Sequence, residues 1–240
     1  MKNEKHAVAD YGEASAEQWG LRAAAAEFLA FSLTYPSADL AEMVADGRWL
    51  EAAGEMAEEL SMPWRKADWE NVLATGIDGA PAKGGEALAN SLRAEATRLF
   101  VGAPDPLVSP YEGVWRAQND GVKALLFVNP HSMDVERFVK ECGLGRPKGT
   151  NEPLDYVVTE LELLSYLASL AAGDDAPDDA APADTLPGGG PASAYQRFFA
   201  EHPAQWLTAY AEALGKTTRL PYYRAVASLL KLSLPILSAS

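Results

Sequence analysis

The carboxylates whose positions best suit binding a cation or a hydrogen-bond donor lie in the segment NEPLDYVVTELELLSYL, residues 151–167. Asp155 follows Pro153, which suits the first turn of a helix because its missing N–H would be unpaired there. Glu160 follows Tyr156 by one turn and lies beside an apolar stripe. A carboxylate among apolar groups needs a partner, because an unpaired buried charge is costly. That partner is either internal, an arginine or a tyrosine hydroxyl, or the cation of a ligand.

Each of these acids also has a plainer interpretation. Asp155 would sit among the free N–H groups of a helix N-terminus, where the helix dipole favours a carboxylate by about 0.3–1 kcal/mol. Glu160 would accept an internal hydrogen bond rather than contact a ligand. The same segment supplies a predicted core stripe at helical spacing, which comprises Leu154, Val157, Val158, Leu161, Leu164 and Ala168.

Other motifs of catalysis or cofactor binding are missing from the sequence. The three histidines are far apart and none has metal-ligand spacing with Cys142. The run LGKTTR, residues 214–219, resembles the end of a phosphate-binding loop, but Tyr210 stands where its first glycine belongs. We interpret the run as a helix C-terminus with Gly215 as its stop. We therefore expect no catalytic residue, no metal site, no cofactor and no enzymatic activity.

Hydrophobic content, net charge and cysteine count limit the classes of protein to which this chain can belong. The chain has 240 residues, of which 48% are hydrophobic, so a sizeable core is expected. The formal net charge is -14 and no basic patch stands out, which argues against nucleic-acid binding. This acidity either attracts a basic partner or only maintains solubility. The lone Cys142 fits a reducing compartment, and the chain has neither an apolar leader nor a run long enough to span a membrane. We expect a soluble, cytoplasmic protein.

Helix signals dominate the first hundred residues. Ser15 and Gln18 form a capping box, and Ser37 can cap a second, short helix through Val44. Two further helices are expected in RWLEAAGEMAEEL and in DWENVLATG, the second ending at Gly76. Residues 86–100 show apolar side chains at helical spacing.

The second half begins with an ordered loop in VGAPDPLVSPYEGVWR, which contains three prolines and two glycines. Two helices are expected after it, from Ser132 to Gly143 and from Pro153 to Ala171. A capping box from Ser193 to Gln196 begins a third helix, and Pro203 starts the next. The last helix is expected to start near Pro221 and to be kinked or ended at Pro235.

The predicted fold class is all-α, with one helical domain of about ten helices over residues 15–240 after a flexible N-terminus, residues 1–14. The run ALLFV, residues 124–128, is the best strand candidate and is ambiguous by its length. Residues 173–193 are rich in acid, alanine, proline and glycine, so we predict a long flexible loop there.

At this point the motifs show a resemblance. EPLDYVVTEL is similar to the signature of the TorD/DmsD/NarJ family of redox-enzyme maturation chaperones, in which Glu-Pro, Asp-His and Glu-Leu recur. The chain departs from that signature at Tyr156, where the family usually has histidine. Three further runs resemble family motifs in the same order: RLFVGAPDPLVSPYEGVW, FFAEHPAQWLTAY and LPYYRAVASLL. The resemblance covers roughly residues 17–235 and is closest to the DmsD/TorD-like branch through SPYEGVW.

The resemblance implies a function. Such chaperones bind the twin-arginine signal peptide of a molybdopterin oxidoreductase of the dimethyl sulfoxide reductase type in the cytoplasm. They assist its maturation and cofactor insertion before export by the Tat pathway. A leader of this kind is an arginine pair followed by an apolar stretch, so it calls for carboxylates beside a hydrophobic groove. The expected partners are this leader and the catalytic subunit, with no nucleic acid and no membrane insertion.

The candidate signal-peptide-binding residues come from two sources. The resemblance supplies Leu99, Phe100, Tyr111, Pro153, Asp155 and Tyr156. The chemistry of the groove adds Glu112, Trp115 and Glu160. Structural alternatives are that Leu99 and Phe100 are plain core, that Trp115 packs a loop onto the body, and that His202, Trp206 and Tyr210 are core residues.

Two alternative functions stay open. A NarJ-like assembly factor would act on a molybdoenzyme subunit that is not exported, and would ignore the arginine pair. A nucleotide-hydrolysing enzyme is a weaker alternative, because LGKTTR offers no complete site. The sequence does not give the oligomeric state: the loop at residues 173–193 permits a monomer or a domain-swapped dimer.

Overall fold

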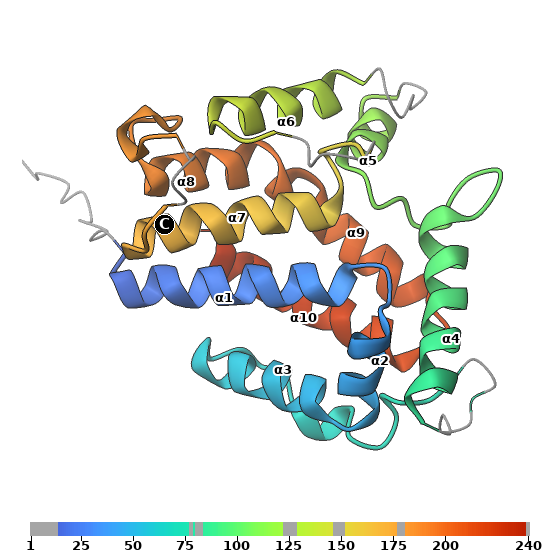
Figure 1. Cartoon of the computed structure of the whole chain (residues 1–240). Helices are drawn as coiled ribbons and strands as arrows, with labels where there is room; N and C mark the ends of the chain where they lie inside the picture. Colours follow the sequence, from blue (N-terminus) through green and yellow to red (C-terminus); the bar gives the residue numbers. More distant parts are fainter. Residues whose placement is uncertain are drawn as a thin grey trace, which may run out of the picture.

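Helices arranged around one buried core make up the computed structural model, which describes residues 14–76, 79, 84–121, 129–145, 152–176 and 181–238 (Figure 1). Within these ranges there is no β-strand, so the predicted all-α class is confirmed. The α-helices are α1 (Ala16–Leu33), α2 (Ala38–Ala45), α3 (Arg48–Glu59), α4 (Gly85–Ala96), α5 (Glu112–Asn119), α6 (Pro130–Glu141), α7 (Val157–Ala172), α8 (Pro191–Glu201), α9 (Pro203–Thr217) and α10 (Pro221–Leu237).

Local sequence sets several of the helix ends. Ser15 accepts the N–H of Gln18 while the Gln18 side chain accepts the N–H of Ser15, so the predicted capping box is confirmed. Ser37 caps α2 by accepting the N–H of Leu40 with its side chain. The chain turns sharply at His202, and Pro203 begins α9, as expected.

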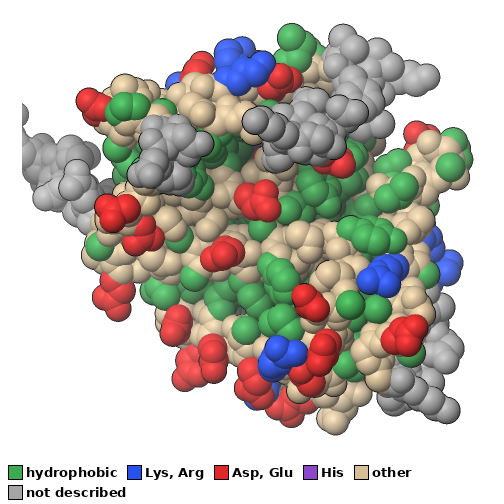
Figure 2. Space-filling view, viewed as in Figure 1, with side chains coloured by type: hydrophobic (Ala, Val, Ile, Leu, Met, Phe, Trp, Pro, Cys, Tyr) green, Lys and Arg blue, Asp and Glu red, His purple; other side chains and the backbone are tan. Residues whose placement is uncertain are grey.

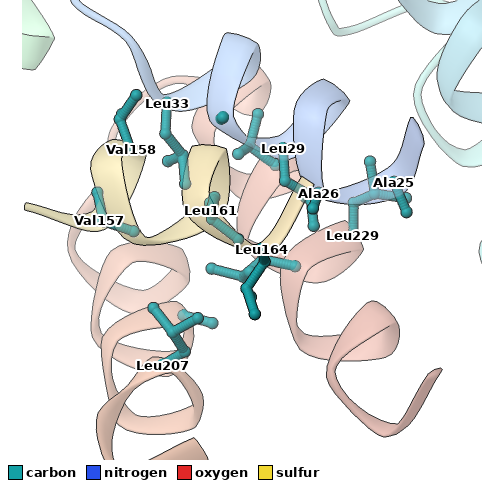
Figure 3. Packing of buried hydrophobic residues seen from close by; sticks show 14 of the residues in the cluster. Ala25, Ala26, Leu29, Leu33, Val157, Val158, Leu161, Leu164, Leu207 and Leu229 are labelled. Carbon is teal, nitrogen blue, oxygen red and sulfur yellow. The ribbon is translucent and has the colours of Figure 1, made fainter. Parts of the chain in front are cut away.

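The centre of the core lies where α1 and α7 pack side by side, with α9 and α10 behind them (Figures 1 and 3). The predicted stripe on α7 is confirmed, because Leu161 and Leu164 have no exposed surface. Figure 3 shows these two side chains between α1 and the leucines Leu207 of α9 and Leu229 of α10. Burying a leucine side chain contributes about 1.5–3 kcal/mol, so α7 is a principal stabilising element.

The start of α7 differs from the prediction. The helix begins at Val157 rather than at Pro153, and residues 154–155 form a turn. The reason is tertiary: Tyr156 forms an antiparallel bridge with Tyr111, which keeps the backbone extended until the helix starts. Asp155 is therefore not a first-turn residue stabilised by the helix dipole, and that interpretation was wrong.

Other boundaries also need correction. Residues 69–74 form successive turns rather than a helix, since Trp69 stacks on Trp64 and short helices are marginal without a packed face. Asn129 caps α6, and Gly190 precedes α8, so Ser132 and Ser193 lie inside their helices. Helix α9 continues to Thr217, so Gly215 does not end it. Helix α10 continues past Pro235 to Leu237.

Some predictions concern residues outside the described ranges. These include all but Ala14 of the N-terminal segment, residues 1–14, and the run ALLFV. Of the predicted loop, residues 173–176 and 181–193 are described; they contain a short 3-10 helix (Ala183–Thr185), the buried Leu186 and the start of α8. The flexibility of this loop stays a prediction. Among the described residues, no helix combines the length and apolar character that crossing a membrane requires.

Candidate functional site

Two segments of the chain meet where α5 and α7 begin, and we call this place the α5–α7 junction (Figure 1). Tyr111 pairs with Tyr156 in the antiparallel bridge. The N–H of Glu112 donates to the Asp155 carbonyl at 2.9 Å, and the N–H of Val157 donates to the Pro110 carbonyl at 2.9 Å. The structure therefore brings the EPLDY and SPYEGVW runs together.

The buried side chain of Asp155 connects three helices at the junction. Its side chain is only 1% exposed. One carboxylate oxygen, Oδ2, accepts the N–H of Gly113 at 3.0 Å and the hydroxyl of Ser132 at 2.6 Å, which joins α5 and α6 to the start of α7. Burial raises the pKa of Asp155, and these two hydrogen bonds partly offset that rise. Ser132, predicted as a helix cap, instead donates to this carboxylate.

Position 113 requires glycine, because the Ser132 hydroxyl and the Asp155 carboxylate lie where a Cβ atom would be. A Cβ at that position would lie 2.4 Å from the Ser132 hydroxyl and 2.9 Å from Asp155 Oδ2. Its carbonyl also accepts a hydrogen bond of 2.6 Å from the amide of Asn129. A side chain at this position would displace the donors that Asp155 needs.

Glu112 is fully buried and has internal partners. Arg116 donates to its Oε1 at 2.6 Å, and His202 Nδ1 lies 3.0 Å from its Oε2. Arg116 also donates to the carbonyl of Glu201 at 2.9 Å, which fixes the break between α8 and α9. His202 packs against Phe198, with ring centroids 5.0 Å apart, so its interpretation as a core residue is confirmed.

Glu160 is the third buried acid. Its Oε2 accepts the indole N–H of Trp206 at 2.9 Å, so its interpretation as an internal acceptor is confirmed. Burial raises the pKa of Glu160 well above its usual value, and the neighbouring Glu112 raises it further. Trp206 and Tyr210 are buried as predicted, and their rings contact each other with centroids 5.3 Å apart.

Half-buried aromatic rings form a surface at the junction, which we call the aromatic surface. The rings of Tyr111 and Tyr156 are half-buried, with centroids 5.8 Å apart. Trp115 is also half-buried and donates its indole N–H to the carbonyl of Ser109 at 2.7 Å, as expected for a side chain that packs a loop onto the body. Burial raises the pKa of Tyr156 to about 12, so its hydroxyl stays protonated at neutral pH. Figure 2 shows hydrophobic side chains on the surface around the N-terminal end of α7.

Glu152 is the accessible carboxylate of this surface. It is exposed, and it accepts a hydrogen bond from the Tyr111 hydroxyl. Sequence reasoning matched Glu152 to the family signature but did not count it as a binding residue. The sequence did contain a signal for its position. Glu152 precedes Pro153, and a residue before proline is held extended, outside the helix that follows.

The remaining predicted site residues have less access to solvent. Leu99 has no exposed surface and its carbonyl accepts the N–H of Val108 at 2.9 Å. Pro153 is buried as well. Phe100 is half-buried and meets the ring of Tyr223 edge-on, with centroids 5.7 Å apart. Among the described residues, no group of three or more His, Cys, Asp or Glu side chains could hold a metal ion.

The comparison with known families gives one match. A family model described as the nitrate reductase delta subunit matches residues 53–212, which is more than half of the chain and includes the whole junction. No curated protein matches the chain.

Proposed function

Because the chain belongs to the nitrate reductase delta subunit family, whose members are non-catalytic maturation chaperones that bind molybdoenzyme catalytic subunits, we propose that it binds a twin-arginine leader. The client would be an exported molybdopterin oxidoreductase of the dimethyl sulfoxide reductase type. By binding the leader in the cytoplasm, the chaperone would delay export until the cofactor is inserted.

The observation that carries this proposal is the aromatic surface of the junction with Glu152 at its edge. The rings of Tyr111, Tyr156 and Trp115 offer apolar area on which the hydrophobic stretch of a leader can pack. An arginine of the leader can then pair with the exposed Glu152 carboxylate. Tyrosine at position 156 retains the ring area and the hydrogen-bond donor that a histidine would supply.

The buried acids have a different part in this proposal. Asp155, Glu112 and Glu160 already accept hydrogen bonds from the chain itself and have at most 1% of their surface exposed. We therefore assign these three to positioning. Asp155 joins α5 and α6 to the start of α7, Glu112 joins α5 to His202 between α8 and α9, and Glu160 joins α7 to α9. Leu99 and Pro153 are buried, so we assign them to the core that supports the binding surface, and the half-buried Phe100 stays a candidate for apolar contact with the leader.

Calorimetry with a synthetic leader from a co-encoded molybdoenzyme tests the proposal. We expect micromolar binding, weakened about tenfold by Tyr156→Ala through lost apolar area and about threefold by Glu152→Gln through a lost surface ion pair. Asp155→Ala should also weaken binding, by loosening the loop. Tyr35→Ala is the matched control, because Tyr35 is 57% exposed and lies on the segment after α1. Absence of heat with any such leader would contradict the proposal.

The family description favours a second candidate. A NarJ-like assembly factor would use the same aromatic surface for the N-terminal segment of a subunit that is not exported. Such a segment carries no arginine pair, so its binding would not depend on Glu152. Leaders in which both arginines are replaced by lysine or by glutamine separate the two candidates: equal affinity for all three peptides would favour the assembly factor.

A further inference from the structure

An open pocket of about 510 Å³ lies between α6 and α8, near the upper edge of the molecule in Figure 1. We call it the α6–α8 pocket. The two helices are side by side there, because the rings of Phe138 and Phe198 pack with centroids 5.0 Å apart. Its wall includes Arg116 of α5, Arg137 of α6 and Arg197 of α8. In a chain with a net charge of -14, three of the 20 lysines and arginines therefore converge on one pocket.

The three arginines already have acidic neighbours, but these use only part of their hydrogen-bonding capacity. Arg116 donates to the Glu201 carbonyl at 2.9 Å through Nη1, the nitrogen it also uses within the junction. Arg197 donates to the Glu201 carboxylate at 3.1 Å, and Arg137 lies 2.9 Å from Asp134. A guanidinium carries several N–H groups, so each arginine retains donors that lack an acceptor within the described ranges.

Glu141 shows what kind of group the space between the arginines accepts. Its carboxylate is exposed and lies 3.8 Å from Arg197 Nη1 and 3.9 Å from Arg137 Nε. These separations exceed a hydrogen bond, so the carboxylate contributes charge without occupying the donors. An oxyanion that approached to about 2.8 Å would pair more strongly with the same two groups. A negative group thus already lies between the two arginines, but loosely.

His202 supplies a second, independent observation. It lines the pocket and is only 3% exposed. Its Nδ1 lies 3.0 Å from one oxygen of Glu112 and 3.3 Å from the other, and because a carboxylate only accepts, Nδ1 carries a proton. Its Nε2 has no partner among the described residues and is not one of the enclosed polar atoms, so it opens to the pocket. A polar atom of this kind on a buried side chain calls for a partner from outside the chain.

We propose that the α6–α8 pocket binds a phosphate group, either free phosphate or the end of a small phosphate monoester. Its oxygens accept N–H groups from the three arginines, and His202 Nε2 shares a hydrogen bond with it. The second pKa of a phosphate group is about 6, so near neutral pH it presents either a P–O–H to the neutral ring or an oxygen to the protonated ring. A carboxylate has only two oxygens and no such donor. This site goes beyond leader binding and does not depend on it.

The probe is inorganic phosphate, titrated into the full chain at constant ionic strength and followed by NMR of the histidine side chains. The chain has three histidines, so His6→Gln and His131→Gln assign the His202 signal by elimination. We expect a saturable shift of the His202 Nε2 resonance. Sulfate has the same shape but no proton to donate, so at neutral pH it should bind at least about threefold more weakly. Absence of a saturable shift, or equal binding of the two anions, would overturn the proposal.

Phenyl phosphate distinguishes the two sources of the phosphate group. Its apolar ring can occupy the part of the pocket that inorganic phosphate leaves open, since about 510 Å³ is available. Tighter binding of phenyl phosphate than of inorganic phosphate assigns the pocket to an ester, and equal affinity assigns it to free phosphate.

Variants of α6 locate the site at exposed side chains, where a substitution should leave the fold intact. Arg137→Gln should weaken phosphate binding by about threefold, and Glu141→Gln should tighten it by about twofold because a competing carboxylate is lost. Lys140→Gln is the matched control: it removes an exposed cation of the same helix outside the pocket and should leave the affinity unchanged. Equal weakening by Arg137→Gln and Lys140→Gln would refute the α6–α8 pocket without affecting the proposed leader binding at the junction.

Discussion

The α5–α7 junction holds three buried carboxylates, whereas the α3 pocket, a shallow pocket beside α3, is lined by three exposed ones. In the junction, Glu112, Asp155 and Glu160 have at most 1% of their surface exposed, and each accepts hydrogen bonds from the chain itself. Glu51, Glu55 and Glu58, the three glutamates of α3 that line this pocket, are exposed, and of these only Glu51 has an ion-pair partner within the described residues. Burial, not residue type, decides whether an acid holds the fold together or stays available to a partner.

The energetic reason is desolvation. Moving a carboxylate out of water is unfavourable unless donors or a counter-charge replace the lost hydration, so the junction acids persist only with Arg116, Ser132, His202 and Trp206 beside them. Acids in the α3 pocket remain hydrated and need no such partners. We therefore expect mutations in the junction to change stability and mutations in the pocket to change it little.

The largest expected contrast comes from Glu112→Gln against Glu58→Gln. Removing the Glu112 charge leaves Arg116 without its counter-charge and weakens the buried hydrogen bond to His202, which should lower the free energy of unfolding by about 2–4 kcal/mol. Glu58→Gln removes an exposed charge and should change it by less than about 0.5 kcal/mol. Urea denaturation of both variants measures the difference.

The double variant is the control for independence. Because the two sites share no contact among the described residues, the effects of Glu112→Gln and Glu58→Gln should add. If Glu58→Gln destabilised the protein as much as Glu112→Gln, the distinction between structural and available acids would fail.

Glycine gives a second contrast between the same two regions. In Gly113→Ala the new Cβ would overlap the Ser132 hydroxyl and Asp155, so we expect a loss of about 2 kcal/mol in the free energy of unfolding. In Gly54→Ala the nearest atom is 3.4 Å away on the flexible Lys66 stem, and alanine favours a helix interior, so we expect a gain of about 0.5–1 kcal/mol. Thermal unfolding measures both; a gain with Gly113→Ala would mean that the junction is looser than its contacts indicate.

Much of the fold could be predicted from sequence because its signals are local. Ser15 and Ser37 were identified as caps from the residues that follow them, and the core stripe of α7 follows from helical spacing alone. Where a distant contact competes with a local signal, the distant contact decides where the helix begins. The expected start at Pro153 is one example, since the bridge between Tyr111 and Tyr156 delays the helix.

The candidate site was harder to predict because its partners are distant in sequence. Gly113 and Asp155 are 42 positions apart, and Glu112 and His202 are 90 positions apart, so no local pattern reports that they meet. The motifs pointed to two segments that the structure brings together. They did not reveal that Asp155 faces inward while Glu152 remains exposed, since that depends on which neighbouring segment covers each side chain.

The most specific test of the junction is the pH dependence of Glu160→Gln. Because the pKa of Glu160 is raised in the folded protein, the folded state retains a proton that the unfolded chain loses above its usual value of 4.5. The resulting stabilisation is complete below that pH and is lost as the pH rises through the folded pKa. Glutamine is neutral and preserves an acceptor for Trp206, so near pH 4.5 the variant should match the wild type within about 1 kcal/mol.

As the pH rises, the wild type should therefore lose stability relative to Glu160→Gln, and the variant should become the more stable of the two. Urea denaturation at several pH values from 4.5 to 8 measures this divergence. The pKa of Asp155 is also raised, and Asp155 interacts electrostatically with Glu160, so the difference between the curves reports the titration of Glu160 together with its effect on that neighbour. Glu162→Gln, an exposed acid of the same helix, is the matched control and should diverge less. Parallel curves for Glu160→Gln and the wild type would show that Glu160 is ionised in the core, and that the junction handles its acids as the α3 pocket does.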